Sequence, residues 1–247
     1  MAARADGRSP GDLRPITFTR DYTTMAPGSV LAEFGRTRVV CTASVETDVP
    51  RWLRNSGRGW VSAEYSMLPG ASAERIPREA SRGRQSGRTH EIQRLIGRSL
   101  RAVTQLELIA DIQITVDCDV LEADGGTRTA SICGGYLALH DAVTRLVSSG
   151  RIARHAVTDL VAAISVGILD DEPLLDLPYS EDARAQTDMN VVMTGGGEFV
   201  ELQGTAERAP FSRAELEVLL DLAADGIGRI HQLQREVLAV PPQARPS

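Results

Sequence analysis

The stretch DGGTRTAS, residues 124–131, joins a strand-like run, IQITVDCDVLEA, to a helix-like run, ICGGYLALHDAVTRLV. Because free backbone N–H groups and the helix dipole favour negative charge where a helix begins, this junction predicts an anion site. The alternative is a plain helix start, with the glycines making the turn and Thr127 capping the helix. Arg128 favours the anion, since an arginine in the first helical turn opposes the dipole unless negative charge lies nearby. In SGRT, residues 86–89, Arg88 stands at a second predicted helix start and could reach the same anion.

Several familiar catalytic and nucleotide-binding patterns are missing. No G-K-[ST] follows the turn, and G-x-G-x-x-G and H-E-x-x-H do not occur. The histidines have no metal-ligand spacing and are interpreted as structural: His90, His140, His155 and His231. The sequence therefore offers no recognisable protein nucleophile.

An acidic cluster, DLPYSEDARAQTDMN, places Asp176, Asp182 and Asp188 at intervals of six residues. Mg²⁺ typically binds one or two carboxylates together with substrate phosphate oxygens, so this cluster is a candidate cation site beside the anion site. The alternative is a set of solvated acids with one buried aspartate that bonds to backbone. Taken together, the anion turns and the carboxylates predict phosphoryl transfer in which the attacking group is a bound ligand and the protein supplies position and charge.

Charge is distributed unevenly along the chain. The net charge is −6, which by itself argues against a nucleic-acid-binding protein, but residues 51–101 contain eleven arginines against four acidic residues. All the basic residues are arginine, which is the better bidentate partner for phosphate. Within this segment, residues 69–87 are rich in Pro, Gly, Ser and Arg and have no apolar periodicity. We call them the basic loop and expect it to be mobile.

Strands and helices that share one core predict an α+β fold in a single domain spanning residues 1–247. One helix is expected from Thr89, as N-cap, to Val103. A second is expected from the glycine-rich turn of residues 124–131 to about Val147, and a third from Arg213 to Val237 with Ser212 as its cap. Strands are expected over residues 14–19, 29–34, 37–45, 59–68, 111–121, 159–171 and 172–179, and over 187–206 as a hairpin.

The remaining features suggest a cytoplasmic protein. The longest apolar run, residues 160–169, is about half the length that a bilayer span requires. Charges and a proline stand where a signal peptide would be apolar. The widely spaced cysteines are expected to be reduced core residues: Cys41, Cys118 and Cys133. Residues 1–10 and 240–247 are expected to be flexible.

Several motifs together resemble the ribonuclease PH family. They are RADGRSPGDLRPITF, GSVLAEFGRTRVVCTASVE, GRGWVSAEYSMLPGAS, SGRTHEIQRLIGRSLRA, CDVLEADGGTRTASI, EDARAQTDMNVVMT and ELQGTAE, in family order and spacing, and they extend from about Arg4 to the last helix. The resemblance implies an exoribonuclease that trims the trailing 3′ nucleotides of precursor tRNA in the 3′-to-5′ direction. It uses inorganic phosphate instead of water and releases nucleoside diphosphates; in reverse it extends RNA 3′ ends. The implied assembly is a homohexamer, a trimer of dimers.

The resemblance also implies roles for individual residues. Arg88 and the turn formed by Gly126, Thr127 and Arg128 would hold phosphate. Asp182 and Asp188 would hold Mg²⁺ or Mn²⁺, and Asp176 also matches the family pattern, which implies no specific role for it. The catalytic set is thus Arg88, Arg128, Asp182 and Asp188.

RNA beyond the catalytic pocket is expected to contact arginines in and before the basic loop: Arg58, Arg75, Arg78, Arg82 and Arg84. A solvated, poorly ordered loop is the alternative.

Two other functions remain open. One is a catalytically silent RNA-binding ring subunit of exosome type. The other is a hydrolytic nuclease, which would not need two arginines reserved for free phosphate.

Overall fold

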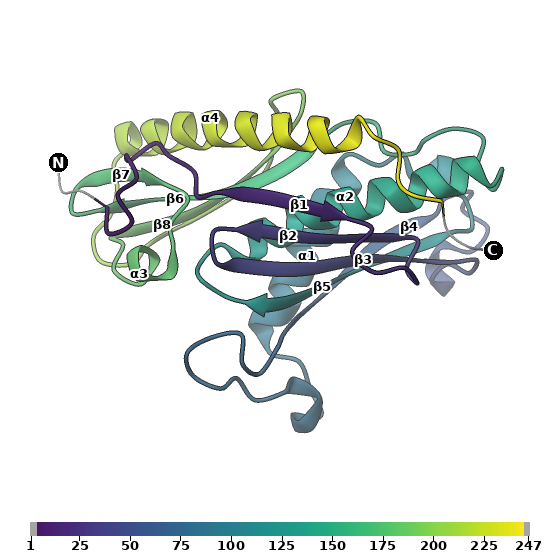
Figure 1. Ribbon diagram of the computed structural model, residues 1–247, viewed down its shortest axis with the longest axis horizontal. Coiled ribbons are helices and arrows are strands. Elements are labelled where there is room, and N and C mark those ends of the chain that lie inside the picture. The colour runs from purple at the N-terminus through teal and green to yellow at the C-terminus, as the bar shows by residue number, and fades with distance from the viewer. Residues whose placement is uncertain (1–3, 245–247) are drawn as a thin grey trace.

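The computed structural model describes residues 4–244, in which two β-sheets pack with four α-helices (Figure 1). The first sheet has five strands in the order β1-β2-β3-β5-β4. Neighbouring strands are antiparallel except β4 and β5, which run parallel because helix α1 connects them. The elements are β1 (Ile16–Arg20), β2 (Gly28–Phe34), β3 (Thr37–Glu46), β4 (Trp60–Met67), α1 (Gly87–Ala102) and β5 (Gln113–Glu122).

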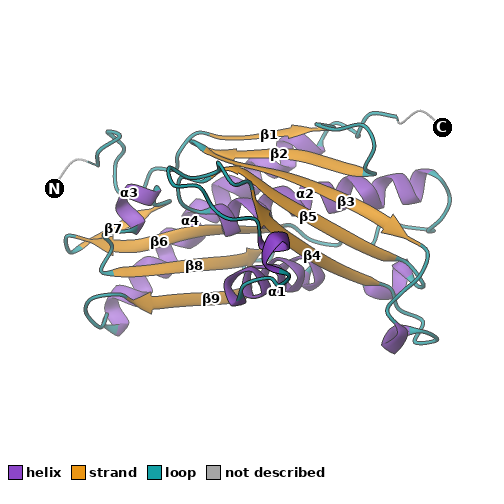
Figure 2. Ribbon diagram, turned by 90° about the horizontal axis from the view of Figure 1, so that it is seen from below, coloured by secondary structure: helices purple, strands orange, loops and turns teal. Residues whose placement is uncertain are grey.

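The second sheet has four antiparallel strands in the order β7-β6-β8-β9 and lies beside the first (Figure 2). Its elements are β6 (Val161–Leu169), β7 (Glu172–Leu175), β8 (Thr187–Thr194) and β9 (Phe199–Ala206). Three more helices accompany the sheets: α2 (Thr127–Ser148), the short α3 (Tyr179–Asp182) and α4 (Arg213–Leu238). Short 3₁₀ turns occur at η1 (Arg51–Leu53), η2 (Glu79–Arg82) and η3 (Leu106–Ile109).

Helix α2 links the two sheets, because it packs against β2 and β3 of the first and against β6 of the second. Most of its residues are buried, as its near-continuous apolar sequence requires. One hydrophobic core therefore includes side chains from both sheets, such as Ile114 of β5 and Ile164 of β6. The α+β prediction is confirmed. The cysteines are free and buried in this core, as predicted. Within residues 4–244, no helix is both long and apolar enough to cross a bilayer.

One predicted helix cap is wrong, one is confirmed, and the cap required by the plain-helix alternative at the glycine turn is not formed. Helix α1 is capped by Ser86, whose hydroxyl accepts a hydrogen bond from the Thr89 N–H at 3.2 Å, so Thr89 lies inside the helix. Helix α2 is capped by Gly126 and not by Thr127. Helix α4 begins with the predicted Ser212 cap, which forms a reciprocal capping box with Glu215.

Both terminal segments that were expected to be flexible are held where the structure describes them. The guanidinium of Arg4 is buried and donates to the Glu181 carboxylate at 2.6 Å and to the Leu175 carbonyl at 2.8 Å. At the other end, the Gln243 N–H donates to Asp21 at 2.8 Å, and its carbonyl accepts from Arg145 at 2.7 Å. Residues 1–3 and 245–247 lie outside the described residues.

Candidate active site

The turn predicted to bind an anion lies between β5 and α2. Gly125 and Gly126 are both left-handed, with φ of 76° and 67°. A Cβ atom on Gly125 would lie 2.5 Å from the Leu177 carbonyl oxygen, so only glycine allows the loop before α3 to pack this closely. No side chain of the described residues caps α2. The first N–H groups of α2 therefore remain available for an anion, at the positive end of the helix dipole.

Asp176 supports this turn and is not part of a cation site. Its carboxylate accepts hydrogen bonds from the Arg14 backbone N–H at 2.8 Å and from the Arg14 guanidinium at 2.7 Å. The same guanidinium donates to the carbonyl oxygens of Asp124 at 2.5 Å and Gly125 at 3.4 Å. The Asp176 carboxylate is therefore occupied by arginine, and through Arg14 it fixes the two peptide groups that shape the turn. The backbone of Asp176 is left-handed, with a φ of 55°. The strand predicted over residues 172–179 therefore ends early, at Leu175.

The two candidate phosphate arginines approach one another from two helix N-termini. Arg128 donates from Nη1 to the Gln203 side-chain oxygen at 2.7 Å and from Nη2 to the Glu91 carboxylate at 3.4 Å. Arg88 is exposed and makes no hydrogen bond or ion pair with residues 4–244. Burial raises the pKa of Asp182, and the positive charges of Arg128 and Arg88 both oppose that rise. Both arginines therefore lie near the same carboxylate, with Arg88 free to bind a ligand.

A tyrosine fixes the hydroxyl of Thr127. The Tyr65 phenol, from β4, lies 2.8 Å from Thr127 Oγ1. Burial raises the pKa of Tyr65, so the phenol is neutral at physiological pH, and either hydroxyl can donate in this bond. The phenol thereby ties the start of α2 to the neighbouring strand β4.

Asp182 ends α3 and Asp188 lies near the start of β8, and the two carboxyl groups are close enough for each to shift the pKa of the other. Burial, followed by the negative charge of Asp182, raises the pKa of Asp188 to about 6. The Glu207 carboxylate also raises the pKa of both groups, whereas Arg128 lowers it. Two crowded carboxylates that resist joint ionisation are an environment that a divalent cation would relieve.

The carboxylate pair matches the binding habits of Mg²⁺. Among residues 4–244, no group of three or more His, Cys, Asp or Glu side chains could hold a metal ion. Mg²⁺ is usually bound by one or two carboxylates and completes its coordination with water and substrate phosphate. Asp182 and Asp188 therefore fit Mg²⁺ or Mn²⁺ that binds together with a phosphate ligand, and do not form a closed protein cage.

The basic loop projects from the body of the molecule, as the blue segment at the bottom of Figure 1. Glu79 connects this loop to the start of α1. Its carboxylate accepts hydrogen bonds from the Thr89 hydroxyl at 2.8 Å and from the Ser86 N–H at 3.2 Å. Arg75, Arg78 and Arg84 are exposed. The side chain of Arg82 lies outside the described residues. Arg58 lies before β4, where it pairs with Glu107 at 3.0 Å.

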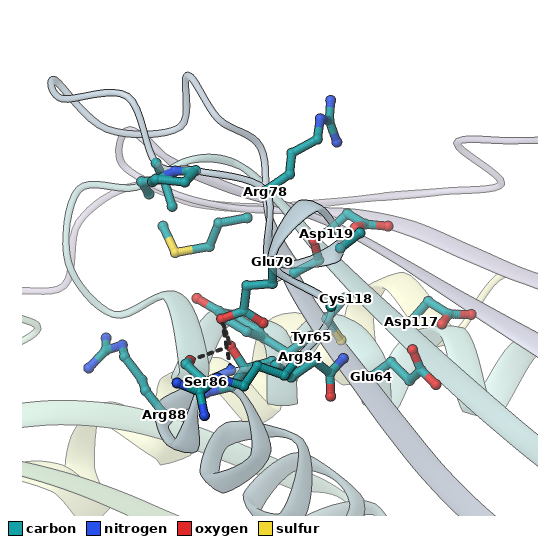
Figure 3. A pocket seen from close by; sticks show the side chains of 18 residues that line it. Glu64, Tyr65, Arg78, Glu79, Arg84, Ser86, Arg88, Asp117, Cys118 and Asp119 are labelled. Atoms are coloured by element: carbon teal, nitrogen blue, oxygen red, sulfur yellow. Dashed lines mark hydrogen bonds between the residues drawn. The ribbon is translucent and has the colours of Figure 1, made fainter.

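A cavity of about 890 Å³ lies between the basic loop and the outer face of β4 and β5. Arg78, Arg84 and Arg88 line it from the loop and α1, and the sheet contributes an acidic floor of Glu64, Asp117 and Asp119. In Figure 3, Arg88 lies across the cavity from Glu64 and Asp117. Burial and the charges of Glu64 and Asp119 raise the pKa of Asp117 to about 6. An anionic ligand would therefore lie along the arginine side of the cavity and away from the acidic floor.

This cavity adjoins the phosphate and carboxylate groups but does not contain all of them. Its lining includes Arg88 and Tyr65 but not Arg128, Asp182 or Asp188. The cavity and the candidate anion and cation sites therefore share Arg88 and the Tyr65 phenol that bonds to Thr127.

The structure brings together six residues that the sequence singled out: Arg88, Gly126, Thr127, Arg128, Asp182 and Asp188. It adds residues that sequence reasoning missed. Arg14, Tyr65 and Gln203 bond directly to the turn, to Thr127 or to Arg128. Glu91 was visible only as an acid in the first turn of a predicted helix, and Gln203 had no distinguishing signal.

Among the solved structures with the same fold are rice Rrp46 and two exosomes. Rice (Oryza sativa) Rrp46 is 20% identical with a TM-score of 0.74, over 95% of this chain and 100% of that one. The Archaeoglobus fulgidus exosome with RNA bound to the active site is 20% identical with a TM-score of 0.77, over 93% and 91%. An archaeal exosome core is 19% identical with a TM-score of 0.73, over 94% and 90%. At these identities the likeness shows the fold alone.

Family models cover most of the chain. The model for domain 1 of the 3′ exoribonuclease family matches residues 12–144, and the model for domain 2 matches residues 159–226. The two matched segments contain the turn before α2, the N-terminus of α1 and both carboxylates of the site. The chain belongs to the 3′ exoribonuclease family of RNase PH type.

Proposed function

We propose that this protein is a phosphate-dependent 3′-to-5′ exoribonuclease. The observation that carries the proposal is the pairing of two arginines, at the starts of α1 and α2, with the carboxylate pair of Asp182 and Asp188. An anion site that is separate from the RNA and lies beside a cation site suits a reaction in which free phosphate is the nucleophile. No protein nucleophile is needed.

In this reaction phosphate binds between Arg88, Arg128 and the N-terminus of α2. One phosphate oxygen attacks the phosphorus of the last phosphodiester, and the bond from that phosphorus to the 3′ oxygen of the preceding nucleotide breaks. The 3′ oxygen takes up a proton, and the last nucleotide leaves as a nucleoside 5′-diphosphate. The arginines hold the attacking group and stabilise developing charge, a contribution of about 10²–10³ in rate for one preorganised donor.

Asp182 and Asp188 are the residues that would hold Mg²⁺ or Mn²⁺. When bound, the cation supplies Lewis-acid stabilisation of charge on the transferred phosphoryl group. The two carboxylates must be ionised to bind it, so the raised pKa of Asp188 predicts weaker cation binding below about pH 6.

We infer that the RNA substrate is the 3′ end of precursor tRNA, and that related trimming of rRNA uses the same site. The exposed arginines of the basic loop, with Arg58 and Arg82, are the proposed contacts to the folded RNA body. The proposed assembly is a cytoplasmic homohexamer, a trimer of dimers, in which a loop could also serve a neighbouring site.

The second candidate function is a catalytically silent RNA-binding ring subunit of exosome type. It is supported by two of the similar solved structures, the Archaeoglobus fulgidus exosome and an archaeal exosome core, which favour this alternative over a free-standing ribonuclease PH. Against it, Arg88, Arg128, Asp182 and Asp188 are all present in this chain and lie close together. A silent subunit has no need to retain the whole set.

The experiment that separates the two functions incubates the protein with an RNA that has an unpaired 3′ tail, with and without phosphate. Chromatography of the released nucleotides should detect nucleoside diphosphates only when phosphate is present. Binding of the RNA without any nucleotide release would favour the silent subunit. Monophosphates released at the same rate without phosphate would indicate hydrolysis.

A further inference from the structure

Arg128 is held by two residues that the proposed reaction has not yet used, Glu91 of α1 and Gln203 of β9. Gln203 Oε1 accepts from Arg128 Nη1 at 2.7 Å, and Gln203 Nε2 donates to Glu91 Oε1 at 2.9 Å. The other Glu91 oxygen accepts from Arg128 Nη2 at 3.4 Å. The three side chains form a closed ring of hydrogen bonds that joins α1, α2 and β9.

The ring determines how each group is oriented. If the Gln203 amide were flipped, its NH₂ group would face the Arg128 guanidinium and its oxygen would face the Glu91 carboxylate, so both bonds would be lost. A glutamate at position 203 would likewise place two carboxylates side by side with no donor between them. Glutamine is the side chain that can bond to a cation on one side and an anion on the other.

Such an arrangement is useful because an arginine side chain is flexible and would otherwise lose freedom when the ligand binds. Arg128 is only 15% exposed, and its ring bonds use two of the five guanidinium N–H donors. The other donors stay available for phosphate. Glu91 also supplies the negative charge that an arginine in the first turn of α2 needs when no phosphate is bound.

We propose that Gln203, together with Glu91, is a positioning residue that holds Arg128 ready to bind inorganic phosphate. The proposal rests on the phosphorolytic function proposed above and extends it to two residues that do not touch the substrate. Gln203 acts only through Arg128, so its effect on phosphate binding depends on the arginine.

The test is direct calorimetric titration of the protein with inorganic phosphate, comparing wild type with Gln203→Ala. The variant should bind phosphate about 2- to 10-fold more weakly, the cost of ordering one long side chain. The KM for phosphate should rise by a similar factor, with a smaller change in kcat. The matched control is Glu201→Gln, on the same strand, which breaks a surface pair with Arg98 of α1 and should leave phosphate affinity unchanged.

Repeating the Gln203→Ala substitution in an Arg128→Lys protein separates a positioning role of Gln203 from a general structural role. In an Arg128→Lys protein, Gln203→Ala should have little further effect on phosphate affinity, because lysine cannot form the same two-pronged contact. An equal loss in both backgrounds, or no loss in the wild-type background, would overturn the proposal. If the wild-type protein itself does not bind phosphate, the proposed function fails first, and the positioning role fails with it.

Discussion

The buried pair of Arg14 and Asp176 gives the sharpest stability prediction. Asp176 is 1% exposed, the Arg14 side chain is 5% exposed, and three hydrogen bonds join the two residues. Asp176→Asn removes the negative charge and leaves the arginine buried without it. Asparagine tolerates the φ of 55° at this position, so the backbone itself should not be strained. Breaking a buried pair by removing one partner costs about 3–5 kcal/mol, and we expect that loss in the free energy of unfolding.

Denaturant unfolding at pH 7 measures this loss, with Asp170→Asn as the matched control. Asp170 pairs with Arg184 at 3.3 Å, but both side chains are more than half exposed, so the control should change the unfolding free energy by less than ~1 kcal/mol. Because Arg14 also holds the Gly125 carbonyl, Asp176→Asn should in addition weaken phosphate binding. A loss below about 1 kcal/mol for Asp176→Asn, no larger than that of the control, would refute the assignment of Asp176 as a structural support.

Three further predictions concern the carboxylate pair, a buried histidine and the basic loop. Asp188 has its pKa raised to about 6, so its ionisation lowers stability as pH rises from about 4 to 6. Asp188→Asn should therefore raise Tm at pH 7 by ~2–8 °C while abolishing cation-dependent turnover, and an unchanged or lower Tm would contradict this. Burial and Arg235 lower the pKa of His231 to about 4, so wild-type stability should fall as pH drops from 6.5 towards 4, by up to about 3 kcal/mol. His231→Gln should lack that slope in pH-dependent unfolding, and parallel curves would exclude His231 as its source. Replacing the four arginines of the basic loop with alanine should raise KM for precursor tRNA and reduce the salt slope of its binding by roughly one unit per lost phosphate contact. The exposed Arg213 serves as the control substitution, and identical salt slopes for loop variant and wild type would show that the loop does not contact RNA.

The sequence predicted most of the elements and the main charged groups of the site, because those features depend on local patterns. Alternating apolar residues mark the strands, and a glycine-rich turn before a helix marks an anion site. The wrong cap of α1 arises from two suitable residues that stand close together in the sequence. Ser86 and Thr89 are both good N-cap residues. The path of the basic loop, which is anchored by Glu79, makes Ser86 the N-cap and places Thr89 inside the helix.

The remaining differences come from partners that are distant in the sequence. The sequence does not indicate that Arg4 is held in place, because its partner Glu181 stands 177 residues away. Asp176 and Asp182 look alike as aspartates in one acidic stretch, yet one pairs with Arg14 and the other with Asp188. Gln203 lies 75 residues from Arg128, and no property of a single glutamine in a strand indicates such a contact.

The central claim is that inorganic phosphate is the nucleophile, and isotope transfer tests it most directly. The protein is incubated with an RNA that has an unpaired 3′ tail in the presence of phosphate labelled with ¹⁸O, and the released nucleotides are analysed by mass spectrometry. Phosphorolysis predicts nucleoside diphosphates that retain every labelled oxygen of the phosphate, and Arg128→Ala should reduce their release by about 10²–10³. Nucleoside monophosphates without label, with the new oxygen derived from water, would contradict the account.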